Sequence, residues 1–166
     1  SDVYKRQHTL LAQSRKPFPI DYRVGKVSVS MICPNIGDED HLYARAGRWS
    51  IKQTMRPWIA HLLLNAAGQH RQASLVGATA SGIEIKTLAA MDQRDAHNAL
   101  ASLVSLYQIS YTAPIFLPIE STWSYLRARH KGQGKEGALA HARAKWANVS
   151  AFEEQTDPYW VRLGRD

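Results

Sequence analysis

The chain has 166 residues, of which 45% are hydrophobic and 21% are charged, and this composition indicates one globular domain and excludes a disordered chain. Lysine and arginine outnumber aspartate and glutamate by 21 to 14, which favours a polyanionic partner such as nucleic acid. The single cysteine, Cys33, excludes an internal disulfide and fits a reducing cytoplasm. No apolar run in the sequence reaches the ~20 residues of a membrane-spanning helix, so we expect no membrane contact.

The first seven residues, Ser-Asp-Val-Tyr-Lys-Arg-Gln, resemble translated sequencing-adaptor read-through. We therefore expect residues 1–7 to be non-native and residues 8–166 to form the domain. On this interpretation the gene extends upstream, and the chain is a fragment of a longer protein.

Two paired strands are predicted in the first third of the chain. Residues 22–31 alternate apolar and polar side chains with a period of two, and residues 34–40 are rich in turn-forming types. Residues 41–49 have the pattern of a returning strand. We therefore predict an antiparallel hairpin in which residues 24–31 pair with residues 42–49.

A helix is predicted next, because Ser50 and Gln53 fit a capping box and apolar residues recur at helical spacing after them. We expect this helix to reach about Ala67, with Pro57 causing a kink or a delayed start near Arg56. The later predicted elements are strands at 73–79 and 82–88, a helix from 92 to about 112, an extended segment at 114–118, helices at 121–130 and 136–148, and a last turn at 157–163. This order of elements indicates a mixed α/β fold.

The motifs of several common catalytic and metal sites are absent from the sequence, including a phosphate-binding glycine loop, a Gly-x-Ser-x-Gly elbow and a His-Glu-x-x-His metal site. His61 lies in an apolar helix, where a core or interface histidine is more common than a ligand. The acidic cluster of Asp38, Glu39 and Asp40 fits either a magnesium site or an Asp-rich turn, and we favour the turn.

The basic region between Trp123 and Trp146 is the best binding candidate in the sequence. Cations interleaved with aromatic residues hold a nucleic-acid backbone and stack on its bases. The alternative is that the aromatic residues face the core while the cations face water. The candidates for DNA binding in this region are Trp123, Arg127, Arg129, Lys131, Arg143 and Lys145.

Several blocks of the sequence resemble the C-terminal part of RecC, the gamma subunit of exonuclease V. The stretch Met55–Gly68 resembles a family helix in which a Trp-x-x-His-Leu core precedes a small residue and glycine. Four further blocks occur in the family's order, namely Leu103–Leu117, Trp123–Leu126, Ala142–Trp146 and Asp157–Leu163. Together the similarity covers Tyr22 to about Leu163.

Resemblance to RecC implies a PD-(D/E)XK nuclease-like fold, a mixed sheet flanked by helices, truncated here at its N-terminal side. Active relatives hold magnesium with an Asp on one strand of a hairpin and an Asp/Glu-x-Lys on the next, and the metal activates water. Ser28 resembles the position of the first acid, Tyr43 that of the second and Arg45 that of the lysine. Serine and tyrosine are poor magnesium ligands, so the resemblance implies no catalytic residue, no bound metal and no cofactor.

The resemblance implies a non-catalytic domain that helps exonuclease V, an ATP-dependent helicase-nuclease, grip and guide DNA in double-strand-break repair and recombination. The implied partners are DNA and the RecB and RecD subunits, and the implied location is the cytoplasm. A second group of DNA-binding candidates lies near the vestigial site and comprises Arg45, Arg48 and Lys52. Two alternatives remain: an active magnesium-dependent nuclease with ligands from residues 38–40, and a scaffold that binds only protein subunits.

Overall fold

The computed structural model describes residues 15–38, 40–147 and 154–163, and the chain divides into two compact units. We call residues 1–107 the sheet unit and residues 108–166 the helical unit. The long helix α3 (Gln93–Ser110) begins in the first unit and ends in the second. Within the described ranges, none of the helices is both long enough and apolar enough to cross a membrane.

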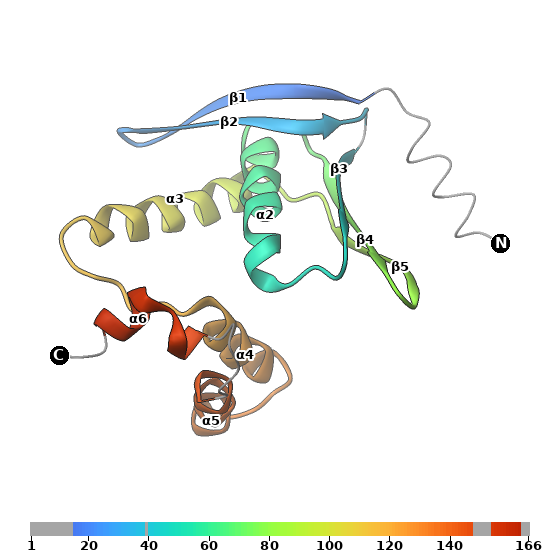
Figure 1. The fold of residues 1–166 in the computed structure, drawn as a ribbon. Helices are drawn as coiled ribbons and strands as arrows, with labels where there is room; N and C mark the ends of the chain where they lie inside the picture. The colour runs from blue at the N-terminus through green and yellow to red at the C-terminus, as the bar shows by residue number, and fades with distance from the viewer. Residues whose placement is uncertain (1–14, 39, 148–153, 164–166) are drawn as a thin grey trace. The chain divides into compact units, whose positions relative to one another are not determined.

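The sheet unit is built on a mixed sheet whose strands follow one another in sequence order (Figure 1). Every neighbouring pair is antiparallel except β3 and β4, which are parallel. The strands are β1 (Lys16–Val24), β2 (Val27–Ile36), β3 (Asp40–Ala46), β4 (Gln72–Thr79) and β5 (Gly82–Leu88). The predicted mixed sheet flanked by helices is therefore confirmed.

The predicted strand at 22–31 is wrong, because the chain reverses direction inside it. Val24 pairs with Val27 across a turn at Gly25, whose φ of 58° lies in the left-handed region that favours glycine. Tyr22 and Val24 lie before the turn and Val29 after it, and the register places these side chains on one face of a long β1–β2 hairpin. Apolar and polar residues alternate on both sides of this two-residue turn, which is why the segment resembled one strand.

The predicted pairing of residues 24–31 with residues 42–49 is also wrong. β2 pairs with β1 along most of its length and meets β3 at Ile36 and His41. β3 instead runs parallel to β4, and it ends at Ala46. Because α2 connects β3 to β4, the parallel pairing follows the usual strand–helix–strand arrangement.

The helix α2 (Ile51–Ala66) forms the centre of the sheet unit's core. Its capping box is present: the Gln53 amide donates to Ser50 Oγ at 3.4 Å, and the Ser50 amide donates to Gln53 Oε1 at 3.1 Å. The helix begins at Ile51, so the delayed start that we expected from Pro57 is wrong. From the apolar stripe we expect Trp58, Ile59, Leu62 and Leu63 to be buried; Leu62 and Leu63 are fully buried, whereas Trp58 and Ile59 are half-buried.

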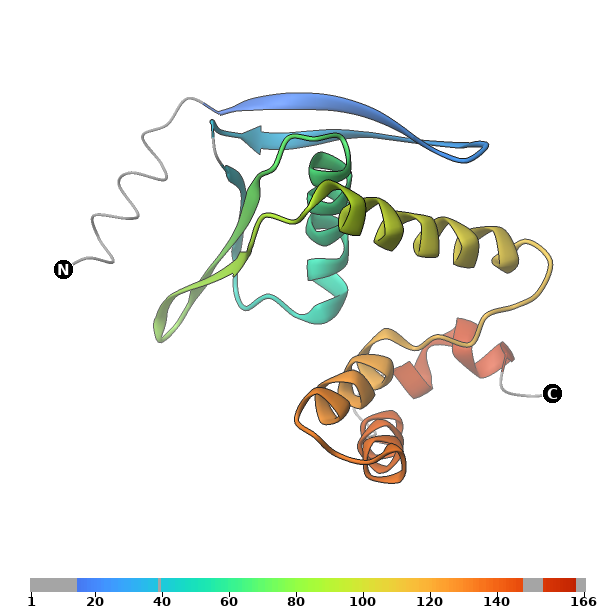
Figure 2. The same cartoon turned by 180° about the vertical axis from the view of Figure 1, so that it is seen from behind.

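The core joins α2 to the β1–β2 hairpin and to α3 (Figure 2). Tyr22 of β1 shares a 2.9 Å hydrogen bond with Nδ1 of His97 on α3, which fixes the hairpin over that helix. The buried core residues are Ile20, Val24, Cys33, Ala60, Leu62, Leu63, Leu64, Ala66, Ala96 and Leu100.

The helical unit contains α4 (Ile119–His130), α5 (Lys135–Trp146), the short 3-10 helix η1 (Glu154–Thr156) and α6 (Pro158–Leu163). These bounds agree with the predicted helices at 121–130 and 136–148 to within two residues, and with the predicted last turn at 157–163. α4 and α5 pack closely, with Ala128 and Ala138 buried. Small residues at these positions let the two helices approach.

Candidate nucleic-acid interface

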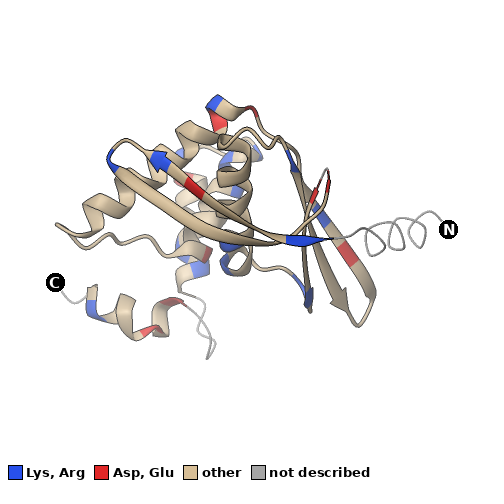
Figure 3. Cartoon of the chain, turned by 90° about the horizontal axis from the view of Figure 1, so that it is seen from above, with Lys and Arg blue, Asp and Glu red and all other residues tan. Residues whose placement is uncertain are grey.

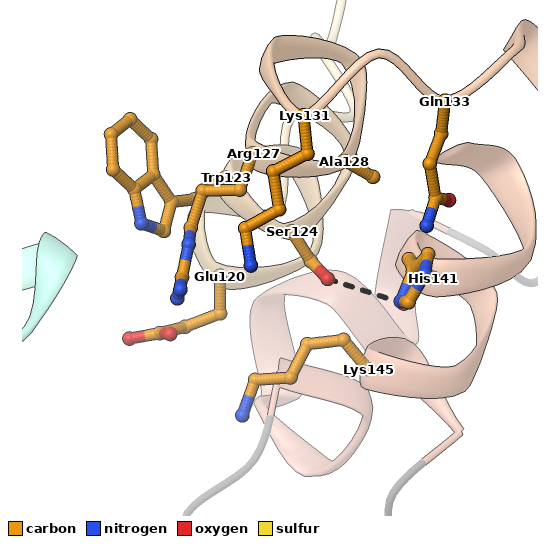
Figure 4. Close-up of a pocket in the computed structure, with 9 residues that line it drawn as sticks. All are labelled: Glu120, Trp123, Ser124, Arg127, Ala128, Lys131, Gln133, His141 and Lys145. Carbon is orange, nitrogen blue, oxygen red and sulfur yellow. Dashed lines mark hydrogen bonds between the residues drawn. The ribbon is translucent and has the colours of Figure 1, made fainter. Parts of the chain in front are cut away.

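A pocket of about 470 Å³ lies between α4 and α5 (Figure 4). We call it the α4–α5 pocket. The Ser124 hydroxyl on α4 donates to the carbonyl of His141 on α5 at 3.3 Å, which ties the two walls together. The residues that line the pocket are Glu120, Trp123, Ser124, Arg127, Ala128, Lys131, Gln133, His141 and Lys145.

Four of the six DNA-binding candidates in the basic region line this one pocket: Trp123, Arg127, Lys131 and Lys145. The first three follow one another at intervals of four residues along α4 and its C-cap, so they form one stripe of that helix. Lys145 approaches from α5. The sequence alone did not predict this convergence, because it depends on how the two helices pack.

The three cations of the pocket make no hydrogen bond or ion pair with any residue in the described part of the chain. Trp123 is 43% exposed, so its indole is partly open to solvent. Cations without internal partners are available to phosphate groups, and an exposed indole is available for stacking on a base. The α4–α5 pocket therefore has the chemistry of a nucleic-acid contact.

The N-terminus of α4 is held by an acid from far along the chain. The Glu154 carboxylate is 4% exposed and accepts hydrogen bonds from the Glu120 amide at 2.5 Å and the Ser121 amide at 2.9 Å. The Ser121 hydroxyl donates to it as well, at 2.8 Å. The N-cap residue, Pro118, offers no side-chain hydrogen bond, so Glu154 satisfies the amides that a cap would otherwise serve.

The remaining candidates of the basic region lie outside the α4–α5 pocket. Arg129 donates to the Gln133 carbonyl at 2.9 Å and so helps to close the connection between α4 and α5. Arg143 lines a second, mostly apolar pocket of about 390 Å³ with Phe116, Tyr125 and Trp146 among its walls. The structure thus separates these two arginines from the other four candidates.

The second group of candidates, in the sheet unit, is largely engaged within the protein. Arg45 donates to the carbonyls of Ala46 and Arg48, and its guanidinium lies 5.7 Å from the ring centre of Trp49. Arg48 pairs with Glu84 at 3.1 Å. Lys52 is exposed on the first turn of α2. Basic residues occur in both units (Figure 3). They differ in what their side chains contact.

The positions that resemble the metal site are not paired with one another. Ser28 pairs with Arg23 of β1, and its hydroxyl donates to Asp21 at 2.5 Å, whereas Arg45 pairs with Gly77 of β4. Burial raises the pKa of the Tyr43 hydroxyl well above its ordinary value, and this hydroxyl has no hydrogen-bond partner among the residues that the structure describes. These positions hold a hydrogen-bonded serine and a neutral phenol.

The acidic turn between β2 and β3 is bound by arginines. Arg15 forms a bidentate pair with the buried Asp40 carboxylate at 2.8 and 3.0 Å and also donates to the Asn35 carbonyl. Arg71 donates to the carbonyls of Gly37 and Asp38. Glu39 lies outside the described residues. Among the residues that the structure describes, no group of three or more His, Cys, Asp or Glu is placed to hold a metal ion.

Two histidines, His41 and His61, are buried in the sheet unit, and His41 lies beside Tyr43. Burial, above all, lowers the pKa of His41 to about 4 and lowers the pKa of His61. The His41 ring lies 4.2 Å from that of Tyr43. The interpretation of His61 as a core residue is confirmed, while the burial of His41 had no signal beyond its place at the start of a predicted strand.

A family model for the RecC C-terminal domain matches residues 1–130, which is more than three quarters of the chain. The chain belongs to the RecC C-terminal domain family. RecC is a subunit of exonuclease V, the RecBCD complex, so the family is that of a component that assembles with RecB and RecD. A comparison with curated proteins finds no match.

The family match covers only part of the α4–α5 pocket of this RecC domain. It includes α4, with Glu120, Trp123 and Arg127, and it ends before α5, with His141 and Lys145. Sequence reasoning missed Glu120, although this residue lies three positions before Trp123 on the same helical stripe. It missed Gln133 and His141 for a different reason, since only the packing of α5 against α4 brings them into the pocket.

Proposed function

We propose that this RecC-family chain is a non-catalytic DNA-binding domain of the exonuclease V gamma subunit, which helps the complex grip and guide DNA in double-strand-break repair and recombination. The observation that carries the proposal is the convergence of Trp123, Arg127, Lys131 and Lys145 on one pocket, where the side chains of the cations have no partner among the described residues. The cytoplasmic location, the PD-(D/E)XK nuclease-like type of the fold and the extent of the domain over residues 8–166 belong to the same proposal.

The proposal is tested by neutralising the pocket in the full chain. Changing Arg127, Lys131 and Lys145 together to glutamine removes phosphate partners, so DNA affinity should fall and its salt dependence should flatten by about one unit of slope for each lost contact. Fluorescence anisotropy with labelled DNA over a range of salt concentrations measures both quantities.

A matched triple variant controls for the loss of net charge. Arg23, Lys26 and Arg94 are exposed cations of the sheet unit that line neither pocket of the helical unit, and changing them to glutamine removes the same charge. Equal losses in both triple variants would mean that the pocket has no special part in binding. If DNA binding survives in the pocket variant while assembly with RecB or RecD fails, the same side chains serve a protein partner and the scaffold alternative holds.

The non-catalytic part of the proposal concerns the acidic turn. An active nuclease would need carboxylates free to bind magnesium, but Asp40 is committed to Arg15, and arginine also occupies the carbonyls of Gly37 and Asp38. We expect no cleavage of linear duplex or single-stranded DNA by the full chain with magnesium or manganese. Metal-dependent cleavage that is lost on Asp38→Ala or Asp40→Ala would establish the active-nuclease alternative.

A further inference from the structure

Glu120 is the acidic residue that lines the α4–α5 pocket, among the cations Arg127, Lys131 and Lys145. An acid near bound phosphates weakens the attraction of a polyanion, so its presence requires a separate explanation. Acids in the first turn of a helix often complement the free amides there. In α4, however, the buried Glu154 carboxylate already accepts from the amides of Glu120 and Ser121.

The Glu120 carboxylate makes no hydrogen bond or ion pair with the described residues. In Figure 4 this carboxylate and the Trp123 indole lie at one end of the pocket, while Gln133 and His141 lie at the other. Trp123 lies three positions after Glu120 on α4, which is about 4.5 Å along the helix axis. A planar ring stacked on the indole would therefore have its edge within reach of the carboxylate.

From this arrangement we propose that Glu120 makes the pocket selective for an unpaired base that carries an exocyclic amino group, such as cytosine, over a base that presents a carbonyl there, such as uracil. The inference rests on the proposed DNA-binding function and names what the same site selects. It concerns unpaired bases because the edge that Glu120 would contact is engaged by the opposite strand in a duplex.

The selectivity follows from hydrogen-bond chemistry. An ionised carboxylate only accepts hydrogen bonds, so it pairs with the N4 amino group of cytosine. Uracil presents the O4 carbonyl at the same place, where two facing acceptors repel, and its nearest donor is the neighbouring N3–H. The preference for cytosine therefore requires that Glu120 faces position 4 of the ring and not position 3. Arg127, Lys131 and Lys145 contact phosphates, which all nucleotides share, so they give affinity without base preference.

The test compares single-stranded oligodeoxycytidine and oligodeoxyuridine of equal length, bound to the full chain at one salt concentration. Cytosine and uracil differ at O4 or N4 and at N3 but have the same ring size and no methyl group, so stacking and phosphate contacts are matched. We expect the cytidine oligomer to bind about tenfold more tightly. In Glu120→Gln the preference should shrink below about twofold, because glutamine both donates and accepts.

A matched control is available on the neighbouring helix. Glu136 is the second residue of α5, as Glu120 is of α4, and it does not line the pocket. Glu136→Gln removes the same charge from the same helical position and should retain the cytidine preference. Circular dichroism on both variants checks that the helices are intact.

The outcomes separate the two proposals. Tight binding of both oligomers with equal affinity by the unaltered chain would overturn the role of Glu120 and leave the DNA-binding function standing. A preference that persists in Glu120→Gln would also overturn it. Absence of binding to either oligomer would overturn the proposed function itself, and the inference with it.

Discussion

Three arginines of the sheet unit and the cations of the α4–α5 pocket differ in their hydrogen-bond and ion-pair partners. Arg15, Arg45 and Arg71 donate to carboxylates and carbonyls of their own unit, where they fix turns and strand ends. Arg127 and Lys131 have no such partners in the described chain. A net positive charge of +7 therefore combines two populations, and only cations without internal partners are available to bind another molecule.

Basic residues in one sequence can serve two different purposes, holding the fold together or binding another molecule. Arginine forms planar, multiple hydrogen bonds, so a buried arginine is well suited to hold backbone carbonyls inside a fold. The pocket uses two lysines and one arginine, and lysine is a compact charge with little geometric demand. Counting positive residues does not distinguish these uses, but the partners of each side chain do.

The largest expected effect is on stability and comes from Asp40→Asn. This change leaves Arg15 buried without its counter-charge, and breaking a buried ion pair in this way costs about 3–5 kcal/mol. Denaturant unfolding measures the loss. Asp38→Asn is the control, because Asp38 is exposed and its substitution should change the unfolding free energy by less than about 0.5 kcal/mol. Comparable losses in the two variants would show that the pair with Arg15 is not what stabilises the turn.

An intermediate effect is expected from pH through His41. Its folded pKa of about 4 lies below the ordinary value of 6.5, so the unfolded chain binds more protons between these values. Stability is therefore complete above pH 6.5 and is lost as the pH falls, by about 2 kcal/mol from this residue at pH 5. His61 acts in the same direction.

Unfolding measured at several pH values tests this expectation. His41→Leu removes the titrating ring from the core and should flatten the dependence of the unfolding free energy on pH. His130 is exposed on α4, and His130→Gln should leave the pH dependence as it is in the unaltered chain. A slope that does not change in His41→Leu would place the responsible group elsewhere.

The smallest expected effect comes from replacing an arginine of the sheet unit by lysine. Arg45→Lys keeps the charge but cannot serve the carbonyls of Ala46 and Arg48 together, so we expect a loss of about 1 kcal/mol. Arg48→Lys, at an exposed pair with Glu84, should cost less than half as much. If DNA affinity falls in Arg45→Lys while stability does not, Arg45 binds DNA and is not, as we describe it, engaged only within the fold.

Much of the fold was predictable from local signals. The capping box at Ser50 and Gln53, the apolar stripe of α2 and the helices of the basic region have the positions that the sequence indicates. The β1–β2 turn had a signal that was missed, because Val24 and Val27 are three residues apart and the alternation changes phase at Gly25. The order strand, helix, strand around α2 likewise indicates a parallel pair rather than a hairpin.

The candidate site was predictable only in part. The residue types and the stripe on α4 follow from the sequence, since helical spacing is local. The convergence of Lys145 with Arg127 depends on the packing of α5, and the contact from Glu154 to Ser121 joins residues 33 positions apart. Such long-range contacts leave no periodic trace in one sequence.

The contact made by Glu154 also bears on where this chain can be divided. The family match ends at residue 130, but the carboxylate that holds the first amides of α4 comes from residue 154, and α5 supplies one wall of the pocket. A piece cut at the end of the resemblance would carry α4 with unsatisfied amides and with half of its pocket. The unit defined by physical contacts is longer than the unit defined by similarity. The end points of a deletion series should therefore be chosen from the contacts and not from the end of the family match.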